Sequence, residues 1–249
     1  MNRIIEPLRN LTKNVLCKSN SKLLRCWVPV WRFHMSPQVL CFLCQMIDET
    51  RSLPGPIVEL GCASGDTTLF LNKHMDVAGI DKPYICVDTF SGFTTTDIEY
   101  EARTRNKANK EFLSASFARN SKKWFDKAME INGLRRVRSI QADVNEFDFA
   151  GLEDISLCLV DVDLYRPVKS ALEKVYPLMA RGGLIVVDDC VPWQPGPSAD
   201  NWDGAYEAYR EFASEHGLKE EIWAGKLALI RTSHQPEAHD AASIEEQTV

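Results

Sequence analysis

Residues 58–68 read V-E-L-G-C-A-S-G-D-T-T and join a short apolar run to an amphipathic segment. Gly61 and Gly65 permit a tight turn between the two and a close approach of backbone to a ligand. The spacing E-x-G-x-x-x-G differs from the G-x-G-x-x-G of dinucleotide-binding folds, so no pyrophosphate-binding loop is present. These residues predict a strand, a loop and a helix with a ligand at the loop, although glycines at such a junction also occur for packing alone.

Short apolar runs and amphipathic segments alternate on either side of this unit. Strands are predicted at residues 57–60, 84–88, 137–142, 155–161 and 184–188, and amphipathic segments at 67–74, 103–131, 168–179 and 201–216. Two more strands, near residues 219–223 and 226–231, are separated by Ala224 and Gly225, which predicts a hairpin at the sheet edge. This alternation indicates an α/β fold with a parallel sheet between helices.

Composition limits the classes of partner. The chain has 249 residues, a net charge of −6 and a pI of about 5.5, which disfavours a nucleic-acid partner. No apolar stretch approaches the roughly 20 residues of a membrane span, and no signal peptide is apparent. The eight cysteines are scattered, which favours a reducing cytoplasm over a disulfide framework.

Two aspartates follow predicted strands next to the glycine loop. Asp88 ends the second strand, where a carboxylate is suited to accept hydrogen bonds from both ribose hydroxyls. Asp143 follows the third strand and could accept one from an adenine amino group. Each could instead be a solvated strand end or a helix cap. Together with the loop, they resemble the class I S-adenosylmethionine-dependent methyltransferases over roughly residues 55–231.

Two acidic pairs end two further strands: Asp161 with Asp163, and Asp188 with Asp189. The carboxyl ends of strands in an open α/β sheet are where ligands bind. Four crowded carboxylates would repel one another and resist ionisation, a conflict that a bound cation removes. Oxygen ligands favour a hard ion, Mg²⁺ first and Ca²⁺ or Mn²⁺ as alternatives. The other interpretation is that each pair ends a strand and caps the next helix.

The stretch containing these pairs resembles one family. Residues 161–189 read D-V-D-L-Y-R-P-V-K-S-A-L-E-K-V-Y-P-L-M-A-R-G-G-L-I-V-V-D-D and are similar to the macrocin O-methyltransferases, as are residues 84–93 (Y-I-C-V-D-T-F-S-G-F) and 205–218. The resemblance implies a Rossmann-like, mostly parallel seven-stranded sheet with helices on both faces and an antiparallel edge strand. It also implies Asp161, Asp188 and Asp189 as the metal ligands and Asp163 as the general base. The residues expected at S-adenosylmethionine are Glu59, Gly61, Ala63, Ser64, Gly65, Thr67, Asp88, Thr89, Phe90, Asp143 and Asp161.

The expected reaction is methyl transfer to a hydroxyl of a small molecule, a sugar or natural-product diol, in a cytoplasmic homo-oligomer that binds neither nucleic acid nor membrane. A catechol-like phenol is the alternative acceptor, but catechol-type relatives carry a lysine base shortly after the first metal aspartate, and residues 162–165 contain none. Another alternative is a non-catalytic S-adenosylmethionine-binding protein, which would not need four carboxylates. A nicotinamide-dependent oxidoreductase is disfavoured by the glycine spacing.

Three parts of the chain are expected. Residues 1–53 form a helical lid or oligomerisation segment, with a helix starting at Ser36-Pro37. Residues 54–232 form the methyltransferase domain, and residues 233–249 a flexible acidic tail. Within the domain, the polar insertion 94–125 is either a lid or a solvated helix face, and Trp193 in the loop 191–203 either walls a substrate ring or anchors the loop.

Overall fold

The computed structural model describes residues 30–107, 110–191 and 203–232. The chain divides into two compact units, residues 1–34 and 35–249, and residues 30–34 are the described part of the first. Most of the predicted N-terminal segment, Trp193 and the tail 233–249 lie outside the described residues. Within the described residues, no helix is long and apolar enough to cross a membrane.

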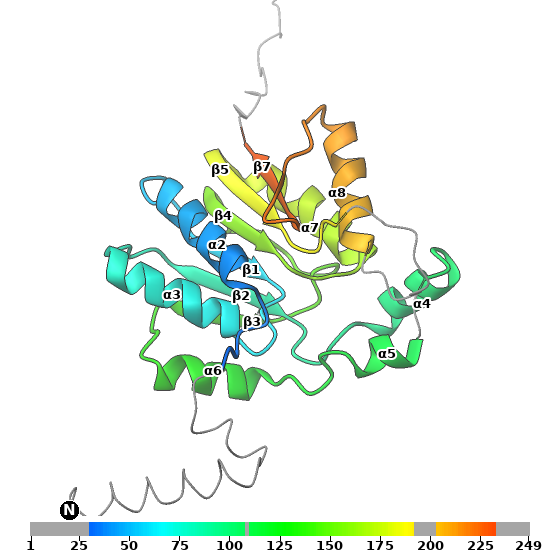
Figure 1. The fold of residues 1–249 in the computed structure, drawn as a ribbon, viewed down its shortest axis with the longest axis horizontal. Helices are drawn as coiled ribbons and strands as arrows, with labels where there is room; N and C mark the ends of the chain where they lie inside the picture. Colours follow the sequence, from blue (N-terminus) through cyan, green and yellow to red (C-terminus); the bar gives the residue numbers. More distant parts are fainter. Residues whose placement is uncertain (1–29, 108–109, 192–202, 233–249) are drawn as a thin grey trace, which may run out of the picture. The chain divides into compact units, whose positions relative to one another are not determined.

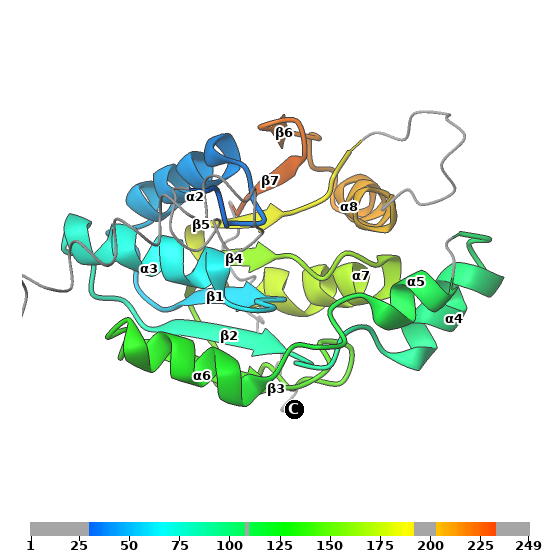
Figure 2. The same cartoon turned by 60° about the horizontal axis from the view of Figure 1, so that its bottom comes forward.

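A seven-stranded sheet in the order β3-β2-β1-β4-β5-β7-β6 forms the second unit (Figures 1 and 2). Strands β1 to β5 are parallel, and β7 runs antiparallel to both β5 and β6. This confirms the predicted fold and the hairpin at the sheet edge, where β6 lies outside β7. The strands are β1 (Ile57–Leu60), β2 (Tyr84–Asp88), β3 (Val137–Gln141), β4 (Ile155–Val160), β5 (Met179–Val187), β6 (Ile222–Trp223) and β7 (Leu227–Arg231).

Seven α-helices are described around the sheet. They are α2 (Pro37–Glu49), α3 (Asp66–Ala78), α4 (Thr95–Arg103), α5 (Lys110–Ala115), α6 (Lys122–Ile131), α7 (Tyr165–Val175) and α8 (Gly204–Glu215). Helix α2 lies beside α3, and α7 beside α8, in both Figure 1 and Figure 2. Helix α2 begins where the sequence predicts, because the Ser36 side chain accepts a hydrogen bond from the Val39 amide and Pro37 occupies the first turn.

The two faces of the sheet differ in chemistry. Val58 and Leu60 of β1 belong to an apolar core that includes the buried faces of α7 and α8. Glu59 lies between them and points to the opposite face, since successive side chains of a strand alternate. There the Thr68 hydroxyl of α3 donates a hydrogen bond to its carboxylate at 2.6 Å. A buried acid is therefore built into the contact between β1 and α3.

Two predicted segments are divided differently in the structure. Residues 103–131 do not form one amphipathic stretch, because Asn106 and Phe117 adopt left-handed backbone with φ of +51° and +57°, which a helix interior does not tolerate. They fall instead into the end of α4, then α5 and α6. Helix α7 ends at Val175, earlier than predicted, and a 3₁₀ turn containing Pro177 follows. Strand β5 then starts at Met179 and is longer than expected.

Candidate active site

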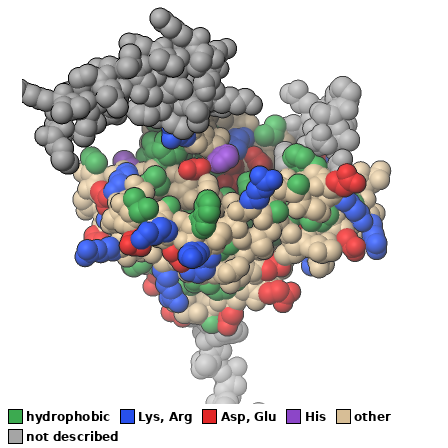
Figure 3. Space-filling view, turned by 90° about the horizontal axis from the view of Figure 1, so that it is seen from below, with side chains coloured by type: hydrophobic (Ala, Val, Ile, Leu, Met, Phe, Trp, Pro, Cys, Tyr) green, Lys and Arg blue, Asp and Glu red, His purple; other side chains and the backbone are tan. Residues whose placement is uncertain are grey.

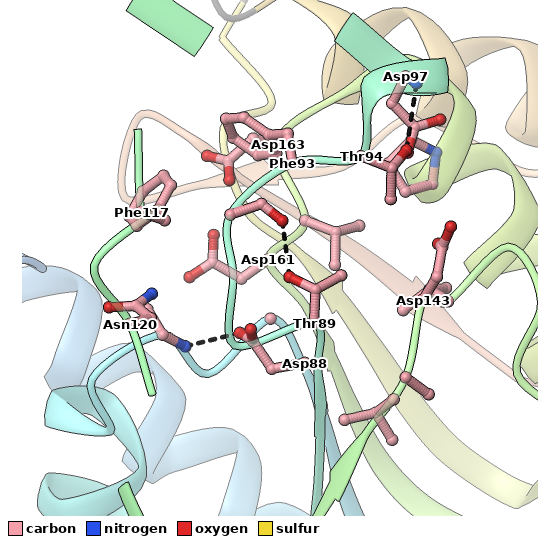
Figure 4. A pocket seen from close by; sticks show the side chains of 18 residues that line it. Asp88, Thr89, Phe93, Thr94, Asp97, Phe117, Asn120, Asp143, Asp161 and Asp163 are labelled. Carbon is pink, nitrogen blue, oxygen red and sulfur yellow. Dashed lines mark hydrogen bonds between the residues drawn. The ribbon is translucent and has the colours of Figure 1, made fainter. Parts of the chain in front are cut away.

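A cleft opens at the carboxyl ends of β1 to β4 (Figure 4). It contains about 640 Å³ of space between protein atoms, part of it open to solvent. Seven of the residues predicted from the sequence line it: Gly61, Ala63, Asp88, Thr89, Asp143, Asp161 and Asp163. The other predicted cofactor residues do not line it: Glu59, Ser64, Gly65, Thr67 and Phe90.

The two loop glycines are required by the protein itself. Gly61 has φ of +84°, and a Cβ atom on it would lie 1.9 Å from the Asp161 carbonyl oxygen. Gly65 has φ of +88°, and its Cβ would lie 2.7 Å from Met129 and 2.8 Å from Phe125 of α6. Gly61 thus lets β1 approach the end of β4 at the cleft wall, whereas Gly65 lets the start of α3 pack on α6. Packing alone explains Gly65.

Asp88 connects the glycine loop to the cleft. One carboxylate oxygen accepts a hydrogen bond from the Ala63 amide at 2.8 Å, and the other from the Phe90 amide at 2.6 Å. A carboxylate has about four lone-pair sites, so acceptor capacity is left for a ligand. Asp88 therefore holds the loop in place and presents an acceptor to the cleft, as a ribose diol requires.

Asp143 lies across the cleft from Asp161 (Figure 4). Its Oδ1 atom accepts hydrogen bonds from the backbone amide and the side-chain amide of Asn145, both at 2.9 Å. Asn145 also donates to Asp97, at 3.1 Å. Asp143 is thus fixed in orientation, which suits an acceptor that reads a ring amino group.

Glu59 is buried and has protein partners. Its carboxylate accepts hydrogen bonds from the hydroxyls of Thr68 and Tyr84, at 2.6 Å and 2.9 Å, and from the Cys86 thiol. Burial raises the pKa of Glu59 to about 7, although these three hydrogen bonds oppose the shift. All three bonds go to Oε2, and direct contact of Glu59 with the cofactor stays a prediction. Glu59 fixes β1 to β2 and α3, and so acts on the position of the loop.

The insertion 94–125 and Phe93, the residue before it, contribute side chains that were not predicted from the sequence. Phe93, Thr94, Asp97, Phe117 and Asn120 all line the cleft. The Thr94 hydroxyl donates to the Asp97 carboxylate at 2.7 Å and accepts from the Asp97 amide, which caps α4. The rings of Phe93 and Phe117 meet edge to face with centroids 5.6 Å apart. The T-x-x-D capping pattern was the available signal for Asp97, whereas nothing in the sequence placed Phe117.

The insertion is also attached to the start of α8. Arg105 is nearly buried and forms ion pairs with Glu101 at 2.6 Å and Asp203 at 3.0 Å, and another with Glu207. Lys107 pairs with Asp203 as well. The charged residues predicted as either a lid or a solvated face thus include two that tie the insertion to the domain.

The four aspartates of the two acidic pairs come together at the ends of β4 and β5. Asp161 and Asp163 line the cleft, and Asp188 is buried beside them. Burial raises the pKa of Asp161, Asp163 and Asp188, and the neighbouring carboxylates raise each pKa further. The Lys226 ammonium counters this repulsion from 2.8 Å to Asp188 and 2.9 Å to Asp189. These four aspartates are called the acidic cluster.

The family follows from a comparison of the sequence with known families. Residues 41–224 match the macrocin-O-methyltransferase (TylF) family. The chain belongs to this family. It is therefore an S-adenosylmethionine-dependent O-methyltransferase. Among curated proteins, no sequence is significantly similar to it.

Solved structures share the fold of this macrocin O-methyltransferase family member. The O-methyltransferase NovP aligns with a TM-score of 0.61 and 17% identity, over 79% of this chain and 80% of NovP. The calicheamicin methyltransferase CalS11 aligns with a TM-score of 0.64 and 18% identity, over 90% of this chain and 93% of CalS11. The apo structure of CalS11, named as a TDP-rhamnose 3'-O-methyltransferase, aligns with a TM-score of 0.52 and 20% identity, over 89% of this chain and 93% of CalS11. At these identities the likeness establishes the fold.

The acidic cluster of this methyltransferase suits a hard cation by its chemistry. Its donors are all carboxylate oxygens, and Asp188 Oδ1 is buried with no hydrogen-bond partner among the described residues. The arrangement is not that of a formed metal site, because no three His, Cys, Asp or Glu side chains in the described part of the chain are grouped to hold an ion. Lys226 instead pairs with two of the carboxylates.

Two of these aspartates adopt unusual backbone. Asp163 and Asp189 have φ of +59° and +55°, in the left-handed region that side chains other than glycine rarely occupy. Such conformations persist where the surrounding structure imposes them, and they are concentrated at functional sites. The acidic cluster therefore contains one strained residue after β4, Asp163, and one after β5, Asp189.

Proposed function

We propose that this enzyme transfers the methyl group of S-adenosylmethionine to one hydroxyl of a vicinal diol on a sugar or a sugar-bearing natural product, with a divalent cation at the acidic cluster. One observation carries the proposal. Asp161 and Asp163 line the same cleft as Asp88 and the glycine loop, so two of the four aspartates of the acidic cluster face the space proposed for the cofactor. A cofactor-binding protein without chemistry has no need of that arrangement.

The cofactor is held by residues already fixed in place. Asp88 accepts hydrogen bonds from the ribose hydroxyls, Asp143 accepts one from the adenine amino group, and the backbone around Gly61 gives the methionine part close access. Because Ala63 and Asn145 hold these two aspartates through hydrogen bonds, the cofactor meets acceptors that are ordered before it arrives.

The reaction is an in-line displacement, so the alignment of the attacking oxygen dominates. Asp163 accepts the proton of the acceptor hydroxyl, the oxygen forms a bond to the methyl carbon, and the carbon–sulfur bond breaks to leave S-adenosylhomocysteine. Asp161, Asp188 and Asp189 would hold the cation, which when bound supplies positive charge that favours the ionised hydroxyl. Burial raises the pKa of Asp163, which makes its carboxylate a stronger base once it is ionised.

Two observations support a sugar over a phenol acceptor. CalS11, which shares the fold, is named for methylation of a sugar nucleotide, TDP-rhamnose. Residues 162–165 contain no lysine that could serve as the base of a catechol-type reaction.

Acidic and basic side chains are interspersed on the face shown in Figure 3, which suits a small acceptor better than a nucleic acid. The homo-oligomer and the cytoplasmic location stay predictions.

The test combines binding and turnover. S-adenosylhomocysteine and Mg²⁺ are titrated calorimetrically into wild type, Asp88→Ala and Asp188→Ala, with the exposed Asp81→Ala as a control. We expect Asp88→Ala to lose cofactor binding and Asp188→Ala to lose Mg²⁺ binding alone, with Asp81→Ala unchanged. Sugar diols and catechols are then assayed for methyl transfer. Cofactor binding without any Mg²⁺ binding, even with a diol present, would remove the cation from the proposal, and turnover of catechols alone would remove the sugar.

A further inference from the structure

Lys226 is placed at the acidic cluster by its backbone. It directly follows the β6–β7 turn, where Ala224 and Gly225 have φ of +50° and +77°. Its amide donates to the Trp223 carbonyl at 3.1 Å, and its carbonyl accepts from the Cys190 amide at 2.7 Å. Cys190 is the residue after Asp189. The hairpin is therefore joined to the end of the acidic cluster, and the start of the Lys226 side chain cannot drift away from it.

The ammonium uses carboxylate oxygens that a cation would need. Its Nζ atom lies 2.8 Å from Asp188 Oδ2 and 2.9 Å from Asp189 Oδ1. The Asp188 side chain is only 4% exposed, whereas that of Lys226 is 31% exposed. In the part of the chain that the structure describes, no other basic side chain forms an ion pair with either aspartate.

We propose that Lys226 is the resident counter-cation of the acidic cluster, and that a divalent ion binds Asp188 and Asp189 only by displacing the Lys226 ammonium. This inference rests on the cation in the proposed function. Two positive charges on the same pair of carboxylates repel strongly in a buried site. A lysine suits such an exchange, because its four-carbon stem is flexible and its ammonium is readily hydrated when it turns outward. The partial exposure of Lys226 provides that route.

Two consequences follow from this exchange. In the protein without the ion, the Lys226 ammonium compensates the charge of the buried carboxylates. This stabilises the fold, since a buried charge left without its partner is strongly destabilising. The ion must compete with the ammonium, so its affinity is lower than the same three carboxylates would give in the absence of Lys226. Lys226 thus sets the concentration of divalent ion at which the acidic cluster becomes loaded.

The experiment measures ion binding directly. Mg²⁺ is titrated calorimetrically into chelator-treated protein saturated with S-adenosylhomocysteine, as wild type, Lys226→Met and Lys226→Arg. We expect at least about tenfold tighter binding in Lys226→Met, whose side chain is similar in length and uncharged. We expect weaker binding than wild type in Lys226→Arg, because a guanidinium pairs with carboxylates in a forked geometry and releases them less readily. The control is Lys219→Met, which removes an exposed charge on the connection between α8 and β6 and should leave the affinity unchanged.

Thermal unfolding gives a second readout. In chelator, Lys226→Met should unfold at a lower temperature than wild type, and Mg²⁺ should raise its midpoint by more than it raises that of wild type. Equal Mg²⁺ affinity in all variants would overturn the displacement and leave the cation in the proposed function. If no variant binds Mg²⁺ while all bind S-adenosylhomocysteine, the cation itself is wrong, and the displacement is overturned with it. Should Lys226→Met not fold, the weakened affinity of Lys226→Arg decides alone.

Discussion

The buried Glu59 makes the stability of this enzyme depend on pH in a calculable way. Burial raises its pKa from the ordinary 4.5 to about 7. The folded state therefore holds the proton more tightly than the unfolded chain does. Its contribution to the free energy of unfolding is complete below pH 4.5 and is lost as the pH rises through 7. Each pKa unit corresponds to about 1.4 kcal/mol, so between pH 5 and pH 8 the loss due to Glu59 is about 2.5 kcal/mol.

The substitution Glu59→Gln removes this titration and keeps an oxygen that accepts from Thr68 and Tyr84. Urea unfolding at pH 5 and pH 8 should show that the variant loses about 2.5 kcal/mol less than wild type over this range. All other ionisable groups are the same in both proteins, so the difference reports on Glu59. The control Glu153→Gln changes an exposed carboxylate and should lose as much free energy of unfolding between pH 5 and pH 8 as wild type does. If Glu59→Gln loses stability as steeply as wild type, the proposed burial of an ionising Glu59 is refuted.

Two further substitutions test the attachment of the insertion and the glycine loop. Arg105→Met leaves the buried Glu101 carboxylate without its ion pair and should lower the free energy of unfolding by about 3 kcal/mol, measured in urea. Arg103→Met, which breaks an exposed pair, should cost less than about 1 kcal/mol. Gly61→Ala places a Cβ 1.9 Å from the Asp161 carbonyl oxygen, so we expect a lower unfolding temperature and loss of S-adenosylhomocysteine binding in calorimetry. Normal binding by Gly61→Ala would show that the loop tolerates a side chain there.

Much of the fold could be predicted because local sequence patterns determine its strands and turns. Strand β1 and strand β2 have the predicted bounds, since each is a short apolar run between turn residues. The hairpin followed from Ala224 and Gly225, which both adopt the left-handed backbone of a tight turn. The insertion could not be divided correctly, because the left-handed residues that follow α4 and α5, Asn106 and Phe117, are not glycines and give no turn signal in the sequence.

The candidate site was predicted where chemistry and strand ends coincide, and less well elsewhere. Asp88, Asp143, Asp161 and Asp163 line the cleft because strand ends in a parallel sheet meet at one edge. Glu59 could not be placed from the loop pattern, since whether a strand residue faces the cleft or a helix depends on the alternation of the whole sheet. Contacts between distant segments also escaped, above all that of Lys226 with Asp188.

The left-handed backbone of Asp163 and Asp189 sets thermal stability against activity. Replacing either residue by glycine would relieve the conformational penalty and remove a carboxylate from a crowded, buried group. A library of variants screened for heat resistance alone should therefore be enriched in changes at these two positions, and the enriched proteins should have lost methyl transfer. The same library screened for turnover should retain both aspartates and gain its heat resistance elsewhere in the chain.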